Sequence, residues 1–234
     1  MQKTDFLIIG GGLAGLFLAL KLAPHGEVII LVKTKINEGN SLLAQGGIAA
    51  VVSEGDSLEQ HIADTLEAGA GLCTPQVVEA TVAQGPDRIR ELIQFGVKFA
   101  SDENSHFFLN REGGHSQRRI LHVEDTTGSA IHEQLLKQAR AHQNIHIIEE
   151  QLAVDLITSK NADERSFAPN RCLGAYVLDK KSGQVNVFLG RSVALATGGA
   201  GKVYLYTSNW SGATGDGIAM AYRAGCRLGN LGFM

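Results

Sequence analysis

The sequence predicts an α/β protein built on a doubly wound parallel sheet of the Rossmann-like, dinucleotide-binding type, with an antiparallel β-meander added to it. Short continuous apolar runs are typical of buried parallel strands. A glycine-rich turn joins the first run to a helix, and a second apolar run completes a strand-helix-strand unit. The 234 residues, of which 44% are hydrophobic, suit one large domain.

The first strand is predicted at 6–9 and is followed by a turn that fits G-x-G-x-x-G, with the residues Gly10, Gly11, Gly12, Leu13, Ala14 and Gly15. Gly10 would permit the tight turn, Gly12 would let the backbone approach a pyrophosphate, and Gly15 would let the helix lie close to the strand. The amides at the helix start would bind the anion. The alternatives are a turn without a ligand and a signal peptide, which the successive glycines followed by Lys21 disfavour.

The second strand, 27–32, ends at Lys33. The generic dinucleotide fingerprint has an acid at this point, which binds the ribose hydroxyls. Lys33 cannot accept a hydrogen bond and would face a phosphate or solvent. The following residues, 34–55, have little periodicity, and a loop of this length in a compact domain is usually functional. Its small and amide side chains suit close approach to a flat ring, and a plain surface excursion is the alternative.

The rest of the chain predicts further helices and strands. Helices are expected at 57–66, 74–95 and 128–142, and strands at 107–109, 145–148, 152–159, 172–178, 185–189 and 191–195. The strand 145–148 would extend the parallel sheet, and the next three would form an antiparallel meander laid on it. We expect 161–170 to be a polar loop, and His61 and Glu67 to be solvated.

Two further segments carry polar or glycine-rich patterns. Residues 111–122 contain three arginines and two histidines around the carboxylate of Glu112, which favours an anionic ligand, or a surface cluster paired with Glu124 and Asp125. A second glycine turn, 196–201, follows a strand, at the edge where doubly wound sheets bind ligands. Asp216 stands at the start of a helix and would cap it, hold a ligand hydroxyl, or do both.

Composition excludes several classes of protein. A net charge of −3 argues against a general nucleic-acid surface, and no apolar run approaches the ~20 residues that a membrane span needs. Cys73, Cys172 and Cys226 lack the spacing of a metal site, so we expect reduced thiols in the core of a cytoplasmic protein and no bound metal.

Taken in order, these motifs resemble the flavoprotein family of succinate dehydrogenase, fumarate reductase and L-aspartate oxidase, and most of all its L-aspartate oxidase branch. The resemblance covers residues 5–234, including the first glycine turn, Lys33, the segment 44–50, the cluster 111–122, and the turns at 196–199 and 215–221. This family commonly ends the second strand with a lysine, which accounts for the missing acid.

The resemblance implies that FAD is bound, and bound noncovalently. The dehydrogenase branch attaches its flavin through a histidine at the position of Asn40. The residues implied to contact FAD are Gly11 to Ala14 at the pyrophosphate, Lys33 beside the adenosine half, Asn40, Ser41, Leu42, Leu43, Ala44, Gln45, Gly46 and Gly47 along the ribityl and isoalloxazine half, Ala153 and Val154 at the adenine, and Asp216 near the flavin.

Glu112 separates the branches of this family. The dehydrogenase branch typically has phenylalanine there, whereas the L-aspartate oxidase branch has glutamate, whose carboxylate can bind the ammonium group that succinate lacks. The resemblance implies oxidation of L-aspartate to iminoaspartate, with oxygen or fumarate reoxidising the flavin and quinolinate synthase using the product for NAD biosynthesis. The alternatives are a soluble fumarate reductase or succinate dehydrogenase-type flavoprotein, and an FAD-binding module without turnover.

Family members continue well beyond Met234. We therefore expect residues 1–234 to be one FAD-binding domain that ends before a substrate-capping domain, with the catalytic residues in the missing part. Family sequences usually carry glutamate at the position of Gly232, and nothing in the sequence explains this departure.

Overall fold

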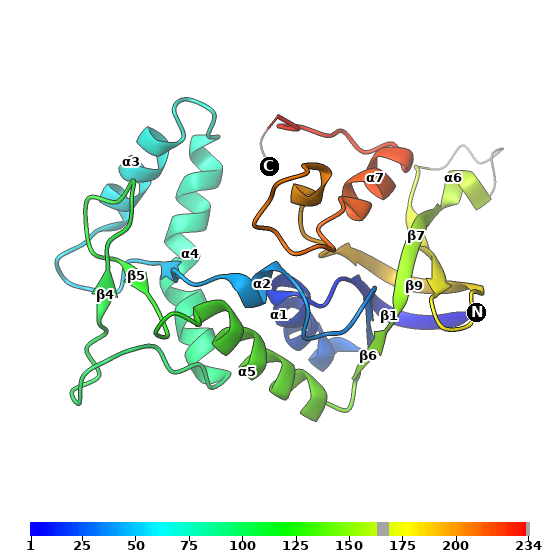
Figure 1. The fold of residues 1–234 in the computed structure, drawn as a ribbon, viewed down its shortest axis with the longest axis horizontal. Coiled ribbons are helices and arrows are strands. Elements are labelled where there is room, and N and C mark those ends of the chain that lie inside the picture. The colour runs from blue at the N-terminus through cyan, green and yellow to red at the C-terminus, as the bar shows by residue number, and fades with distance from the viewer. Residues whose placement is uncertain (163–168, 233–234) are drawn as a thin grey trace. The chain divides into compact units, whose positions relative to one another are not determined.

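The computed structural model describes residues 1–162 and 169–232 (Figure 1). The chain divides into two compact units. Unit 1 comprises Met1–Leu42 and Leu135–Met234, and unit 2 comprises Leu43–Gln134. Most of the polar loop predicted at 161–170 lies outside the described residues.

Unit 1 contains a six-stranded sheet with the strand order β6-β2-β1-β9-β8-β7. Its strands are β1 (Gln2–Ile9), β2 (Val28–Val32), β6 (Ile145–Glu149), β7 (Gln151–Thr158), β8 (Cys172–Asp179) and β9 (Val185–Leu195). The neighbours β6, β2, β1 and β9 run parallel, whereas β9, β8 and β7 run antiparallel. The predicted parallel sheet and antiparallel meander are therefore confirmed.

The prediction was wrong in how the meander joins the sheet. The expected strands 185–189 and 191–195 form one continuous strand, β9, so the meander extends the parallel sheet instead of lying on it. The first part of β9 pairs with β8 and its later part with β1. Gly190 permits this path, because a Cβ there would lie 2.8 Å from the Ser192 carbonyl oxygen and 3.0 Å from the Leu7 Cβ.

The helical segments of unit 1 are short. They are α1 (Leu13–Leu22), η1 (Ala23–His25), α6 (Ser159–Ala162), η2 (Gly201–Val203) and α7 (Asp216–Arg223), while α2 (Asn40–Leu43) and α5 (Thr127–Ala141) cross the boundary between the units. Helix α1 packs on β1 and β2, and α7 packs on β7.

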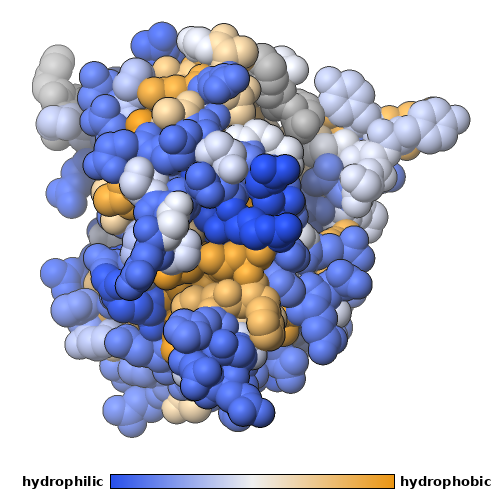
Figure 2. Space-filling model, turned by 90° about the vertical axis from the view of Figure 1, so that its left-hand side faces the viewer, coloured by the Kyte–Doolittle hydropathy of each residue, from blue (hydrophilic) through white to orange (hydrophobic). Residues whose placement is uncertain are grey.

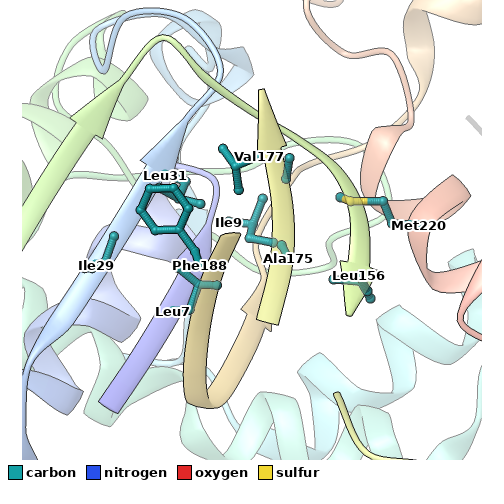
Figure 3. Close-up of a cluster of buried hydrophobic side chains, with 10 residues drawn as sticks. Leu7, Ile9, Ile29, Leu31, Leu156, Ala175, Val177, Phe188 and Met220 are labelled. Carbon is teal, nitrogen blue, oxygen red and sulfur yellow. The ribbon is translucent and has the colours of Figure 1, made fainter. Parts of the chain in front are cut away.

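The core of unit 1 lies along the sheet. A buried cluster, shown in Figure 3 with every member but Ala153 labelled, consists of Leu7, Ile9, Ile29, Leu31, Ala153, Leu156, Ala175, Val177, Phe188 and Met220. Side chains alternate between the faces of a strand, so Ile8 and Ile30 are buried on the opposite face. This two-sided burial explains why β1 and β2 have continuous apolar sequences.

Unit 2 pairs two helices and a small antiparallel sheet. Its elements are α3 (Leu58–Ala68), α4 (Pro75–Gln94), and the strands β3 (Ile48–Ala49), β5 (Ile120–Leu121) and β4 (Leu109–Asn110), in the order β3-β5-β4. Ser57 caps α3 by accepting from the Gln60 amide at 3.1 Å, and the helix predicted at 74–95 is α4, which begins at Pro75. The stretch 34–55, predicted to lack regular structure, contains α2 and β3.

Figure 2 shows one face, on which hydrophilic side chains surround an exposed hydrophobic area.

The exposure of the cysteines corrects one further expectation. Cys73 is half-buried, but Cys172 and Cys226 are exposed, so the prediction of core thiols was wrong for these two. Cys172 begins β8, and Cys226 follows the end of α7. Within the described residues, no helix combines the length and apolar character needed to span a bilayer.

Candidate functional site

A cavity of about 420 Å³ lies in unit 1 at the carboxyl ends of β1, β2 and β9. Its walls are the β1–α1 turn, the residues that end β2, the segment 38–41, the start of β7, the turn after β9, and the side chains of Trp210, Asp216 and Met220. Ligands of doubly wound sheets bind at this edge, and the volume is in the range of small-molecule pockets.

The three glycines of the first turn have different structural roles. Gly10 has φ +118°, and a Cβ there would lie 2.2 Å from the Ala196 carbonyl oxygen. A Cβ at Gly15 would lie 2.0 Å from the Gly10 carbonyl oxygen, so helix and turn are in close contact as predicted. A Cβ at Gly12 would meet one described atom within 4 Å, the Ser41 hydroxyl oxygen at 3.3 Å. The fold therefore does not require glycine at position 12. The absence of a side chain there leaves space in the cavity for a ligand.

The start of α1 suits an anionic group. Gly12 is the N-cap and has no side chain with which to cap the helix. The Leu13 amide donates to the Ser41 hydroxyl at 3.3 Å, and the first turn contains no acidic residue. The positive end of the helix dipole and the glycine backbone thus face the cavity, which fits a diphosphate.

Lys33 lies in the cavity wall and contacts a carboxylate. Its Nζ is 2.6 Å from Asp216 Oδ2, 2.8 Å from Thr214 Oγ1, and 5.6 Å from the centre of the Trp210 ring. The N-cap of α7 is Gly215, with φ +75°, and Asp216 is the first residue of the helix. Of the roles predicted for Asp216, that of helix cap is wrong, because its carboxylate binds Lys33 instead.

Asn40 is held from both sides. Its Nδ2 donates to Asn209 Oδ1 at 2.8 Å, and its Oδ1 accepts from the Trp210 amide at 2.7 Å. The side chain joins α2 to the 209–210 segment, so Asn40 shapes the wall that Trp210 completes. The sequence did not lead us to predict Trp210 as a site residue. The available signal was that the one tryptophan of the chain stands beside a glycine-rich segment.

The structure places part of the predicted FAD set in this cavity. The lining includes Gly10, Gly11, Gly12, Leu13, Ala14, Lys33, Asn40, Ser41, Ala153 and Asp216. Gly15 and Leu42 are not among the lining residues, and neither is Val154. Val154 lies at a β-bulge, its side chain is 45% exposed, and its carbonyl accepts from Arg223 Nη2 at 2.7 Å. The segment 196–198 also lines the cavity, at the predicted second glycine turn.

Unit 2 contains the predicted site residues of the segment 43–47 and Glu112. The segment 43–47 comes before β3, with the Ala44 and Gln45 carbonyls accepting from the Gly128 amide and the Thr127 hydroxyl. A Cβ built on Gly46 would lie 2.5 Å from Glu112 Oε1, so the predicted substrate carboxylate rests against the predicted flavin segment. A Cβ at Gly47 would lie 2.3 Å from the Leu121 carbonyl oxygen.

Arg119, beside this segment, is buried and fully paired. Its Nε and Nη2 each donate to Asp56 at 2.7 Å, and its Nη1 donates to Asp64 at 2.6 Å. These bonds raise the pKa of Arg119, and the bonds from Arg119 lower the pKa of Asp56. The pKa of Asp64 lies far below its usual range, chiefly because its carboxylate accepts a hydrogen bond from the Ser116 amide and also because it accepts one from Arg119. The predicted pairing with Glu124 and Asp125 was therefore wrong for this arginine.

His61 lies against the same cluster. It is 8% exposed, and its ring centre is 5.7 Å from that of His115. Its Nδ1 has no hydrogen-bond partner among the described residues. Burial, and then the positive charge of Arg119, lower the pKa of His61. The prediction of a solvated His61 was wrong, because α3 turns this residue toward the buried cluster, while Glu67 on the same helix is exposed as predicted.

Comparison with known proteins agrees with this geometry. A family model described as "FAD binding domain" matches residues 5–234. L-aspartate oxidases from Pseudomonas aeruginosa and Acinetobacter baylyi are 50% and 48% identical, over 99% and 98% of this chain. The chain spans 44% and 42% of the length of these curated relatives.

Among solved structures, the quinol fumarate reductase of E. coli superposes with a TM-score of 0.88 at 28% identity. The match covers 95% of this chain and 37% of the reductase chain. A flavocytochrome c3 fumarate reductase, solved in an open conformation, gives a TM-score of 0.81 at 28% identity, over 96% of this chain and 41% of that protein.

Proposed function

Because the chain belongs to the FAD binding domain family, and its cofactor is FAD, we propose that it is the FAD-binding part of an enzyme that oxidises L-aspartate to iminoaspartate. The observation that carries this proposal is the place of Glu112, whose carboxylate rests against Gly46 in the segment expected along the flavin. A carboxylate at that point can bind the ammonium of an amino acid, and succinate or fumarate offers no such group.

The cavity of unit 1 would hold FAD by its diphosphate and adenosine parts. The start of α1 with Gly12 faces the diphosphate, and Ala153, which is 5% exposed, would meet the adenine. Lys33 would bind a phosphate or a hydroxyl group of FAD, and Asp216 would accept from a hydroxyl group, each in exchange for part of their mutual ion pair. Gly15 and Val154 act indirectly, Gly15 through helix packing and Val154 through the bulge beside Ala153.

The segment 40–47 would follow the ribityl and isoalloxazine half. Asn40 offers a carboxamide, which forms no covalent bond to a flavin, so FAD is held noncovalently. Bound FAD supplies the oxidising group, and the protein binds and orients the substrate. Glu112 would take the ammonium of aspartate with a charge-assisted hydrogen bond.

Residues 1–234 would form a single FAD-binding domain, and residues outside this sequence would supply the substrate-capping domain and the catalytic groups. This agrees with the share of the relatives' length that the chain spans. The protein would work in the cytoplasm. Its product, iminoaspartate, would pass to a quinolinate synthase for NAD biosynthesis. A soluble fumarate reductase is the second candidate, favoured by the likeness to the E. coli enzyme.

The substitution Glu112→Gln tests the proposal in the longest gene product that contains this chain. It keeps the size of the side chain and removes the charge, with a loss of about 1.5–3 kcal/mol of binding. Aspartate-dependent peroxide release should fall about ten- to a hundredfold, while fumarate reduction stays near the wild-type rate.

The control is Glu67→Gln, which changes an exposed glutamate on α3 and should leave both activities unchanged. An equal loss of aspartate oxidation and fumarate reduction, together with a lower melting temperature, would mean that Glu112 serves stability and does not recognise substrate.

A further inference from the structure

The loop 112–119, which carries Glu112, ends in a charged side chain that solvent does not reach. Arg119 is 0% exposed, and its partners Asp56 and Asp64 are nearly as buried. Asp56 takes two parallel hydrogen bonds from the guanidinium, and Asp64 takes a third. A buried guanidinium is costly unless its donors are paired in good geometry, so these bonds restrict Arg119 to one position.

Asp64 and Arg119 also contact two residues that come earlier in the loop. Asp64 Oδ2 accepts from both the amide and the hydroxyl of Ser116, each at 2.8 Å. Arg119 Nη1 lies 3.2 Å from His115 Nδ1. A guanidinium has donors and no acceptor, so His115 Nδ1 is the acceptor in this contact. Helix α3, through Asp64, thus fixes residues 115, 116 and 119.

The remaining residues of the loop have few contacts of their own. The His115 amide donates to the Glu112 carbonyl at 3.3 Å. Between them stand Gly113 and Gly114, of which Gly114 has φ +81°. Two glycines offer no side chain to restrain this segment, so Glu112 is held by β4, which ends at Asn110, and by the anchored residues that follow the glycines.

We infer that Arg119 and His115 are positioning residues, which hold loop 112–119 so that Glu112 keeps its place against Gly46. The inference rests on the proposed role of Glu112 as the group that binds the substrate ammonium. Arg119 is buried and acts through the loop, and it does not touch the substrate itself.

Two substitutions of His115 test the inference. The side-chain oxygen of His115→Asn lies near the position of Nδ1 and can accept from Arg119, whereas His115→Leu offers no acceptor. We expect His115→Leu to raise the KM for aspartate about ten- to a hundredfold, as a loop displaced by ~1 Å would. The KM for fumarate should change less than about twofold, and His115→Asn should behave nearly as wild type for both substrates.

Arg119→Lys gives a second measurement. Lysine keeps the charge but lacks the planar fork that binds Asp56 twice, so the same aspartate-selective rise in KM is expected, with a lower melting temperature. Arg90→Lys is the matched control, because Arg90 pairs with Asp87 on the exposed surface of α4. If Arg119→Lys does not fold, the His115 pair decides, since His115 is half-buried and its substitution does not leave a charge unpaired.

The outcomes separate this inference from the proposed function. If Glu112→Gln is selective for aspartate but His115→Leu is not, or if His115→Asn and His115→Leu are equally impaired, the positioning role is wrong and the role of Glu112 stands. If both substrates lose activity in proportion to the fall in melting temperature, the cluster serves stability alone. If Glu112→Gln itself shows no selectivity, the proposed function and the inference fall together.

Discussion

Gly12→Val should abolish FAD binding without unfolding the protein. Gly12 has φ −74° and ψ −173°, an extended conformation that valine adopts readily. The nearest described atom to a Cβ there is the flexible Ser41 hydroxyl, at 3.3 Å. The added methyl groups would therefore extend into the cavity, beside the first amides of α1.

The size of the effect follows from the contacts that a phosphate would lose. A hydrogen bond to a charged group contributes about 1.5–3 kcal/mol, so losing two costs about 3–6 kcal/mol. This weakens FAD affinity by roughly 10²- to 10⁴-fold. The apoprotein should lose at most about 1 kcal/mol, which lowers the melting temperature by about 2–4 °C.

The assay is a titration of the apoprotein with FAD, followed by the fluorescence of Trp210, which lines the cavity and is the one tryptophan of the chain. Gly15→Val should unfold the protein, because its Cβ would lie 2.0 Å from a backbone oxygen. Gly229→Val, with no described atom within 4 Å of its Cβ, should change neither property. A folded Gly12→Val protein with wild-type FAD affinity would refute the reasoning.

Three further predictions concern the flavin linkage and the buried cluster. Acid precipitation of the holoprotein should leave all the flavin in the supernatant, because Asn40 provides no imidazole, and yellow pellets would contradict this. Asp64→Asn should destabilise by about 3–5 kcal/mol, or about 6–20 °C in melting temperature, because it weakens a buried ion pair, whereas Asp87→Asn on the surface of α4 should cost less than about 1 kcal/mol. Because hydrogen bonds from Ser116 and Arg119 depress the pKa of Asp64, the unfolded chain takes up protons first on acidification, and the free energy of unfolding should fall below about pH 4. Denaturant titrations at several pH values should show a shallower fall for Asp64→Asn, and an unchanged slope would exclude Asp64 as the cause.

The parts of the structure that the sequence predicted well depend on neighbouring residues. The turn after β1 needs its glycines at fixed spacing, and the helix starts at Ser57 and Thr74 have local signals. The continuous β9 was missed because the role of Gly190 depends on β1, which is far away in the sequence.

The buried cluster could not be predicted for a similar reason. Arg119 pairs with residues 55 and 63 positions away, and these distant aspartates compete with the nearer Glu124 and Asp125 that the sequence suggested. Likewise, the bulge that exposes Val154 arises from the register between β7 and β8, which the pattern of one strand does not contain.

An anaerobic titration of the oxidised, FAD-bound protein with L-aspartate and with succinate tests the central claim most directly. The measurement follows the visible absorbance of the flavin in the longest gene product that contains this chain. Aspartate should bleach the flavin to completion, and succinate should leave it oxidised, because only aspartate offers an ammonium to Glu112. Bleaching by succinate, or a flavin that stays oxidised with saturating aspartate, would contradict the account.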